Sequence, residues 1–238
     1  MSDLNLLNLI ANGTMSAQIA ALLSAIGAEQ RSFLVAALPR LAGKSTVAEA
    51  ILQCAPEGTL RHDLSGDITQ MHDLAAQGRG GYIIVAEFAP GDRGSYLGGD
   101  RARLAIDTAR AGYSIAGTLH ADSIEEAYDA LHTAFGASDE QASVFDYLVY
   151  IKRFGDGPEP QNYWRRVAGV YELERVVDGK PEARQLFDWD SASDTFDSVE
   201  QPRLLVTSPD VLEERTRALQ ALVDSGSTAF DEMTSVVS

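Results

Sequence analysis

The sequence is poor in basic residues and has almost no cysteine. Its 238 residues contain 19 Lys and Arg against 35 Asp and Glu, which gives a formal net charge of −16. Because a charge of that sign repels the phosphate backbone, we expect no nucleic-acid partner. The one cysteine, Cys54, excludes an internal disulfide and fits a reducing cytoplasm. On a predicted helix it is expected to be a buried, inert thiol.

Long apolar runs are also missing. No stretch approaches the ~20 apolar residues that a helix needs to cross a bilayer. The opening MSDLNLLNLIANG has no basic residue before its apolar part, so we do not expect a secretory signal. With 45% apolar and 23% charged residues, the composition is that of an ordinary globular protein with one core domain and a small appendage. We therefore expect a cytoplasmic protein.

Apolar runs alternate with helical patterns up to Gly136. Continuous apolar character predicts strands at 32–38, 81–88 and 113–120, and a further strand at 58–65. Helical spacing predicts helices at 2–11, 16–27, 44–55, 67–78, 100–111 and 123–136. Strands that alternate with helices favour an α/β fold in which a mostly parallel sheet is covered on both faces.

The pattern changes after Gly136. Alternating, aromatic-rich segments at 145–154, 164–177 and 183–190 predict strands that extend the sheet as hairpins, with a loop or hairpin tip at 155–162. Residues 209–236 return to helix, with Ser208 as a candidate cap. We therefore divide the chain into a helical lead-in at 1–30, a core at 31–205 and a C-terminal helical segment at 206–238.

The loop LPRLAGKST carries the clearest chemical signal, because it joins an apolar strand to a helix as a P-loop does. Backbone N–H groups of such a loop and the N-terminus of its helix bind phosphate together. Lys44 would reach the β- and γ-phosphates, and the Ser45 hydroxyl would bind Mg²⁺. The predicted nucleotide-binding residues are Pro39, Arg40, Leu41, Ala42, Gly43, Lys44, Ser45 and Thr46. The motif requires a glycine where Leu38 stands.

Two more polar residues stand where strands of the predicted sheet end. Glu87 closes the apolar strand YIIVAEF, at the edge where open α/β sheets bind ligands. Its carboxylate could orient or deprotonate a water, or hold the water shell of a metal; the alternative is an ordinary surface glutamate. His120 closes the strand at 113–120 and could contact a γ-phosphate, or it is a structural histidine.

Six stretches of this sequence, taken in order, resemble stretches of the secretion-superfamily ATPases. They are LPRLAGKST, YIIVAEF, TLHADSIEEAYDAL, RRVAGVYELERV, LFDWDSASDTF and RALQALVDSGSTAFDEMTSVV. These are the motors of type II and type IV secretion and of type IV pili, and the resemblance covers roughly Leu4 to Thr234. It implies a RecA-like P-loop core, ATP and Mg²⁺ as ligands, a hexameric ring, and an inner-membrane platform protein as partner at the inner face of the membrane. By matching position it implies that Glu87 is the catalytic carboxylate and that Thr118 and His120 belong to the histidine box.

The chain also departs from that family. Leu38 and Leu41 stand where the family has glycines, and a leucine at φ > 0 costs about 1–2 kcal/mol. The arginine-bearing segment is reduced to Arg61 and Arg79, with Asp63 as the acidic-box candidate. We expect the family's separate N-terminal domain to be missing.

Three functions therefore stay open. The first is a compact, slow motor ATPase, which the intact lysine, serine, glutamate and histidine favour. The second is a degenerate relative that binds nucleotide weakly or not at all and serves as an assembly or regulatory subunit, which the lost glycines and arginines favour. The third is a P-loop enzyme such as a small-molecule kinase, which would need a basic lid that the acidic C-terminal third does not offer.

Overall fold

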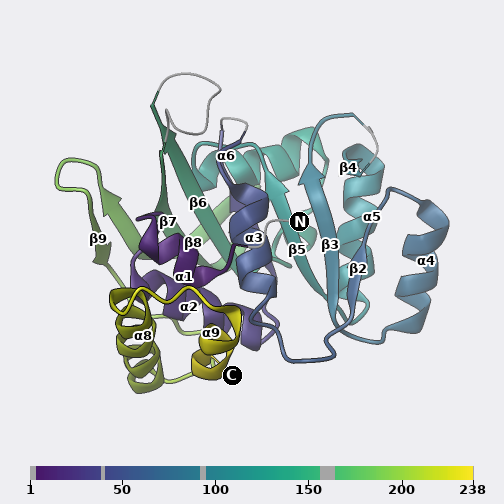
Figure 1. Cartoon of the computed structure of the whole chain (residues 1–238). Coiled ribbons are helices and arrows are strands. Elements are labelled where there is room, and N and C mark those ends of the chain that lie inside the picture. Colours follow the sequence, from purple (N-terminus) through teal and green to yellow (C-terminus); the bar gives the residue numbers. More distant parts are fainter. Residues whose placement is uncertain (1–3, 39–40, 92–94, 156–163, 238) are drawn as a thin grey trace.

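The computed structural model describes residues 4–38, 41–91, 95–155 and 164–237. Within them the strands form one sheet in the order β2–β3–β5–β1–β6–β7–β8–β9, with β4 paired to β3 (Figure 1). Pairing is parallel from β2 to β6 and antiparallel from β6 to β9. The strands are β1 Phe33–Ala36, β2 Arg61–Asp63, β3 Tyr82–Phe88, β4 Tyr96–Leu97, β5 Ser114–Leu119, β6 Tyr147–Phe154, β7 Trp164–Val177, β8 Lys180–Asp190 and β9 Thr195–Ser198. The expected α/β fold with a mostly parallel sheet is confirmed.

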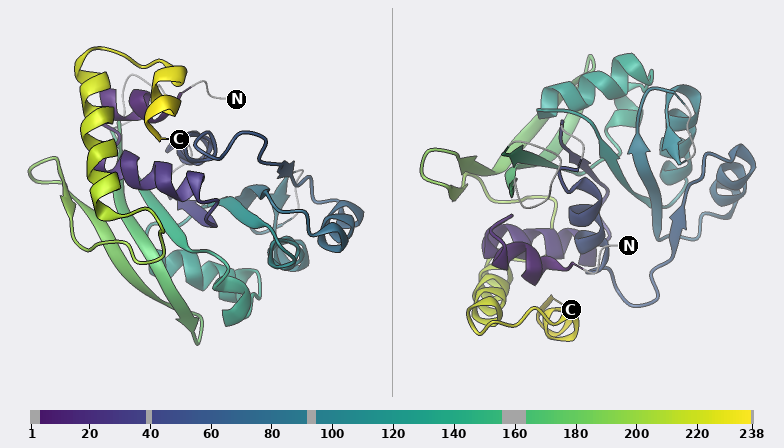
Figure 2. Two further views of the ribbon diagram at one scale, coloured as in Figure 1. Left: turned by 90° about the horizontal axis from the view of Figure 1, so that it is seen from below. Right: turned by 45° about the horizontal axis from the view of Figure 1, so that its top comes forward.

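Helices cover both faces of this sheet. They are α1 Leu6–Ala11, α2 Ala17–Ala28, α3 Lys44–Leu52, α4 Ile68–Gln77, α5 Gly99–Arg110, α6 Ile124–Asp129 with the π-helical turn η1 Ala130–Ala134, α7 Asp139–Ala142, α8 Pro209–Asp224 and α9 Phe230–Val237. The helices from the two ends of the chain gather on one side of the strands, and the helices from the middle lie on the other side (Figure 2).

Strand β1 belongs to both cores. Its side chains alternate, so that Phe33 and Val35 join the core under α1, α2 and α3, whereas Leu34 and Ala36 join the core on the other face. All four residues have no exposed surface. This is why the strand reads as a continuous apolar run rather than as an alternating pattern.

Some local features go beyond the sequence-based predictions. The helical character predicted over 209–236 is divided between two helices, because α8 ends at Asp224 and α9 begins at Phe230. Gly226 has φ +83°, and the N–H groups of Gly226 and Ser227 donate to Val223 and Leu222, which is a glycine-terminated helix end. The strands β4 and β9 and the short helix α7 are not predicted by any local pattern. The predicted hairpin tip at 155–162 lies outside the described residues, apart from Gly155.

Other local predictions are confirmed. The Ser16 hydroxyl accepts from the Ile19 N–H, and the Ser208 hydroxyl accepts from the Val211 N–H, so both residues cap their helices. Cys54 is buried just after α3, and burial raises the pKa of its thiol to about 12. The thiol is therefore protonated at neutral pH, as expected for an inert cysteine. No described helix is long and apolar enough to cross a membrane.

Hydrogen bonds connect the N-terminal helices to the C-terminal segment. The Asn5 side-chain amide donates to the Thr228 carbonyl at 2.9 Å. The Glu29 carboxylate, at the end of α2, accepts from the backbone N–H groups of Val206 and Thr207 and from the Thr207 hydroxyl. These bonds position the segment that leads into α8, which packs against α2. Whether 1–30, 31–205 and 206–238 behave as separate units stays a prediction.

Replacement of Glu29 by Gln is expected to lower stability at neutral pH. Desolvation raises the pKa of Glu29, but hydrogen bonds from Val206, Thr207 and Arg31 outweigh it, and the net pKa lies below its ordinary value of 4.5. A lowered folded-state pKa contributes stability above the unfolded pKa, and this contribution is lost as the pH falls through the folded value. Glu29→Gln should therefore cost about 1 kcal/mol at pH 7, and the difference from wild type should shrink below about pH 4.5. Urea denaturation at several pH values measures this; two curves that stay parallel across the whole range would contradict it.

Candidate functional site

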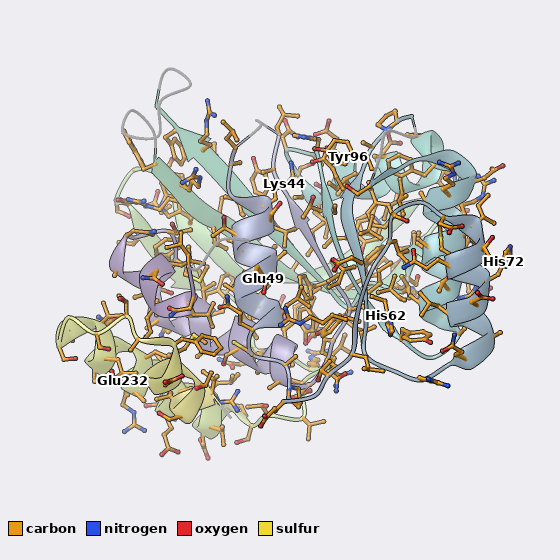
Figure 3. All side chains as sticks on the ribbon, turned by 45° about the vertical axis from the view of Figure 1, so that its right-hand side comes forward. Lys44, Glu49, His62, His72, Tyr96 and Glu232 are labelled. Carbon is orange, nitrogen blue, oxygen red and sulfur yellow. The ribbon has the colours of Figure 1, made fainter. Side chains whose placement is uncertain are left out.

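A hollow of about 440 Å³ lies at the carboxyl edge of the parallel strands, over the head of α3. Figure 3 places Lys44 and Tyr96 at this edge, whereas His62 lies toward the opposite end of the sheet. The hollow is lined by Leu41, Ala42, Gly43, Lys44, Ser45, Thr46, Glu87, Tyr96, His120 and Arg165. The described part of the predicted nucleotide loop is thus brought together with Glu87 and His120. Pro39 and Arg40 lie outside the described residues.

The N-terminus of α3 lies at this hollow, which residues 43–46 line. Gly43 takes the N-cap position, and no side chain among the described residues caps the helix there. The first N–H groups of a helix have no partner within the helix, and the helix dipole adds a partial positive charge at that end. An anion is the ligand that such an uncapped end attracts.

The loop reaches this geometry with one glycine and one strained leucine. Gly43 has φ +94°, and Leu41 has φ +61°, in the left-handed region. Leu38, which replaces the first glycine of the motif, is not among the described residues with positive φ. The structure therefore separates the two substitutions: Leu41 carries a backbone cost of about 1–2 kcal/mol and Leu38 does not.

Lys44 is buried, and among the described residues its ammonium contacts Glu87 and His120. Its side chain is 8% exposed, and its Nζ lies 3.5 Å from Glu87 Oε2. The same Nζ lies 3.2 Å from His120 Nε2, and His120 Nε2 lies 3.3 Å from Glu87 Oε1. A buried ammonium needs a counter-charge, and here Glu87 supplies it. Three side chains from three separate segments therefore form one compact polar cluster.

The His120 ring is oriented by the loop itself. Its Nδ1 lies 2.8 Å from the Leu38 carbonyl oxygen, which can only accept a hydrogen bond, so Nδ1 carries the proton. The Lys44 ammonium lies at nearly equal distances from the two ring nitrogens, 3.3 Å from Nδ1 and 3.2 Å from Nε2. The histidine thus links the start of the P-loop to the end of β5.

A bulge in β3 directs Glu87 toward this cluster. Val85 pairs with Gly117 and Phe88 with Leu119, so three steps along β3 match two along β5. Ile83, Val85 and Phe88 all join the same core, which means that the alternation slips by one residue at the bulge. Without that slip, Glu87 would occupy the buried position that Phe88 takes.

Thr118 stabilises this bulge rather than lining the hollow. Its hydroxyl donates to the Ala86 carbonyl at 2.6 Å, and the residue is 4% exposed. It therefore satisfies a carbonyl in the part of β3 where the register with β5 shifts. The catalytic role predicted for Thr118 stays a prediction, and the contact observed is with the backbone beside Glu87.

Sequence reasoning missed Arg165 and Tyr96. Arg165 reaches the loop from β7, and Tyr96 pairs with Glu87 across β3 and β4. Nothing in the local sequence marks Arg165, because its partner in the loop is 124 positions away. The acidic-box candidate Asp63 does not line the hollow, and Arg61 pairs instead with Glu49 and the Leu52 carbonyl.

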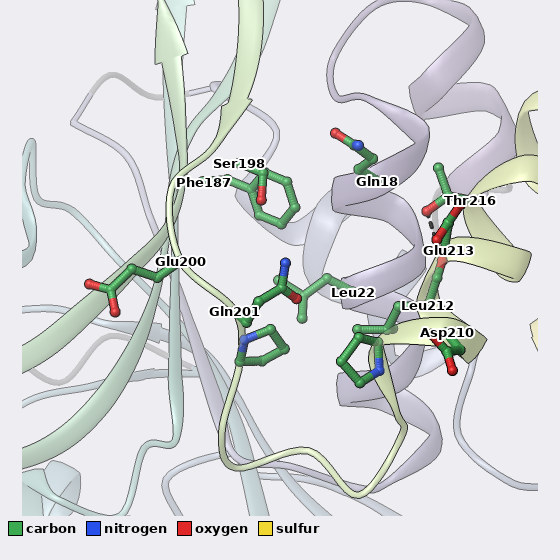
Figure 4. A pocket seen from close by; sticks show the side chains of 12 residues that line it. Gln18, Leu22, Phe187, Ser198, Glu200, Gln201, Asp210, Leu212, Glu213 and Thr216 are labelled. Carbon is green, nitrogen blue, oxygen red and sulfur yellow. Dashed lines mark hydrogen bonds between the residues drawn. The ribbon is translucent and has the colours of Figure 1, made fainter.

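A second hollow has the wrong charge for a phosphate. It measures about 290 Å³ and lies between α2, α8 and the segment after β9 (Figure 4). Its apolar part includes Leu22 and Phe187, and its acidic residues are Glu200, Asp210 and Glu213. Carboxylates without basic lining residues repel anions, so of these two hollows the one at the head of α3 suits a nucleotide.

The fold and the site define an α/β protein whose candidate site is a P-loop-type cradle at the carboxyl ends of parallel strands. No protein-family model matches the chain, and no curated protein matches it. Among solved structures, it is similar to the VirB11 ATPase of the Brucella suis type IV secretion system in complex with sulphate, with a TM-score of 0.46, 17% identity and coverage of 70% of this chain and 54% of the other. It is also similar to the ATPase DotB of Legionella pneumophila, with a TM-score of 0.41, 14% identity and coverage of 88% and 56%. The chain spans about half the length of these two structures.

Gly43→Ala is expected to destabilise the loop for two reasons. The residue has φ +94°, and an added Cβ would lie 2.9 Å from Arg165 Cδ. Gly58 is a matched control, because it has φ +82° with nothing within 4 Å of an added Cβ. Gly58→Ala should cost about 1 kcal/mol from the backbone alone, and Gly43→Ala roughly 2 kcal/mol. Urea denaturation of both variants measures the difference, and equal losses would show that Arg165 does not crowd Gly43.

Proposed function

We propose that the chain binds ATP with Mg²⁺ in the hollow at the head of α3 and hydrolyses it slowly, as a subunit of a secretion or pilus assembly machine. The observation that carries this proposal is the convergence of Lys44, Glu87 and His120 on an uncapped helix N-terminus. The ordered sequence motifs that resemble secretion-type ATPases support the choice of ATP and of the machine.

Lys44 would exchange one counter-charge for another when a triphosphate binds. In the structure its ammonium faces the Glu87 carboxylate at 3.5 Å. A γ-phosphate in the cradle attracts Lys44 more strongly than a single carboxylate does, because it carries more negative charge. Glu87 is then released to orient or deprotonate the attacking water, and His120 lies beside both groups to contact the phosphate.

Ser45 fits the role of a magnesium ligand. It lies in the first turn of α3, is exposed and lines the hollow. Mg²⁺ usually takes one or two protein oxygens and fills its other positions with phosphate oxygens and water, and it neutralises phosphate charge during transfer. No group of three or more His, Cys, Asp or Glu side chains in the described residues could hold a metal alone. A site shared with the nucleotide therefore matches the side chains that are there.

The second candidate is a subunit that binds nucleotide with little or no turnover. Among the described residues, Arg165 is the arginine that lines the hollow, and its guanidinium already bonds the Leu41 carbonyl. An arginine that neutralises the transition state can contribute a factor on the order of 10³–10⁵ in rate. A chain that lacks one would retain the ATP while turning it over slowly, and would then serve an assembly or regulatory role.

Titration with MgATP, beside a phosphate-release assay, separates these candidates. Lys44→Ala should abolish binding, because it removes the buried positive charge at the cradle. Glu87→Gln should retain binding and lose turnover by a factor on the order of 10²–10⁴. Lys180→Ala, at the exposed start of β8, is the control and should change neither quantity. Wild-type protein that binds no ATP at millimolar concentration would refute the motor, and binding without turnover would leave the second candidate.

ATP is expected to promote a larger assembly. Large apolar side chains are exposed in and near the hollow, and a neighbouring subunit could cover them. Leu38 is 51% exposed, Leu41 64%, Tyr96 42% and Trp164 55%. By sequence resemblance we propose a six-membered ring, with a platform protein of the inner membrane as a further partner. Light scattering after size exclusion should show a species near six times the 25.6 kDa chain mass when MgATP is present. A monomer under every nucleotide condition would contradict the motor.

A further inference from the structure

The Leu41 carbonyl receives two hydrogen bonds from one arginine. Arg165 Nε lies 3.1 Å and Arg165 Nη2 3.0 Å from that oxygen. Leu41 is also the loop residue in the left-handed region, with φ +61°. The carbonyl oxygen of the strained Leu41 residue therefore accepts two hydrogen bonds from the Arg165 guanidinium.

The same arginine side chain passes over Gly43. A Cβ built on Gly43 would lie 2.9 Å from Arg165 Cδ and 3.2 Å from Arg165 Nε. Arg165 thus contacts the loop at two residues, one on its backbone oxygen and one through packing. It comes from β7, on the antiparallel side of the sheet, whereas the loop follows the parallel strand β1.

We propose that Arg165 is a positioning residue of the phosphate cradle, which holds the Leu41 peptide in the conformation that a glycine would reach without strain. The inference rests on the proposed function for its choice of ligand, but the clamp itself is a property of the loop. A leucine left without this clamp returns to a conformation with negative φ, because the left-handed region is unfavourable to it. The cradle then loses the shape that lines the hollow.

The side-chain chemistry explains why arginine is required. A guanidinium presents parallel N–H groups in a rigid plane, so two of them can bond one oxygen at once. A lysine would place a single mobile ammonium there and would keep the charge without the geometry. Positioning and simple charge attraction therefore predict different behaviour for Arg165→Lys.

The test is a set of variants of the full chain measured for MgATP binding and for thermal unfolding. Arg165→Ala should weaken MgATP binding about tenfold, and Arg165→Lys should weaken it nearly as much. Leu41→Gly should change little by itself and should restore most of the affinity in the Arg165→Ala background. Arg175→Ala is the matched control, because it lies on the same strand and is ion-paired only to Glu182 among the described residues. It should bind as wild type does.

Two results would overturn the inference. One is that the effects of Leu41→Gly and Arg165→Ala on MgATP affinity are additive, so that Leu41→Gly does not restore binding to Arg165→Ala. The other is wild-type affinity in Arg165→Lys, which would mean that charge alone matters. If wild-type protein binds no MgATP, the proposed function fails, and the clamp is then judged by the unfolding temperatures. Arg165→Ala should lower the midpoint less in the Leu41→Gly background than in wild type, and equal losses would reject the clamp.

Discussion

The candidate site depends on β1 being buried on both faces and hydrogen-bonded on both edges. Its side chains enter two cores alternately, and it pairs in parallel with β5 on one side and β6 on the other. Such a strand has no freedom to shift, because a slip of one residue would exchange every side chain between the cores. The point at which β1 ends is therefore fixed, and so is the start of the loop that leads to Lys44.

Parallel pairing then brings the other site residues to the same edge. β5 lies between β1 and β3, and the carboxyl ends of all three strands meet where α3 begins. His120 follows β5 directly, and Glu87 lies within the bulge near the end of β3. A ligand crevice at the carboxyl ends of strands is the usual consequence of this topology. The bulge adds what topology alone does not supply, since it directs a carboxylate toward Lys44 instead of into the core.

The charges in the cluster are compatible with the proposal that Lys44 exchanges Glu87 for a phosphate. A strongly acidic chain places a buried ammonium beside one carboxylate and one imidazole. Breaking a buried pair without a replacement is costly, so Lys44 leaves Glu87 only for another anion. Under the proposed function, this pairing would neutralise Lys44 in the absence of phosphate and would couple the release of Glu87 to the binding of phosphate. The resting contact and the proposed catalytic role of Glu87 therefore follow from the same charge.

The sequence by itself determined the α/β class, the positions of the principal strands, and the residues Gly43, Lys44, Ser45, Glu87 and His120 as a set. These were predictable because hydrophobic period and strand ends are local properties of the chain. Only the tertiary structure decided which leucine is strained, that Thr118 supports the bulge, and that Arg165 reaches the loop. It also decided that Asp63 lies outside the hollow. The physical reason is that strand register, a bulge and a contact across 124 residues arise from the packing of distant segments, which no local pattern encodes.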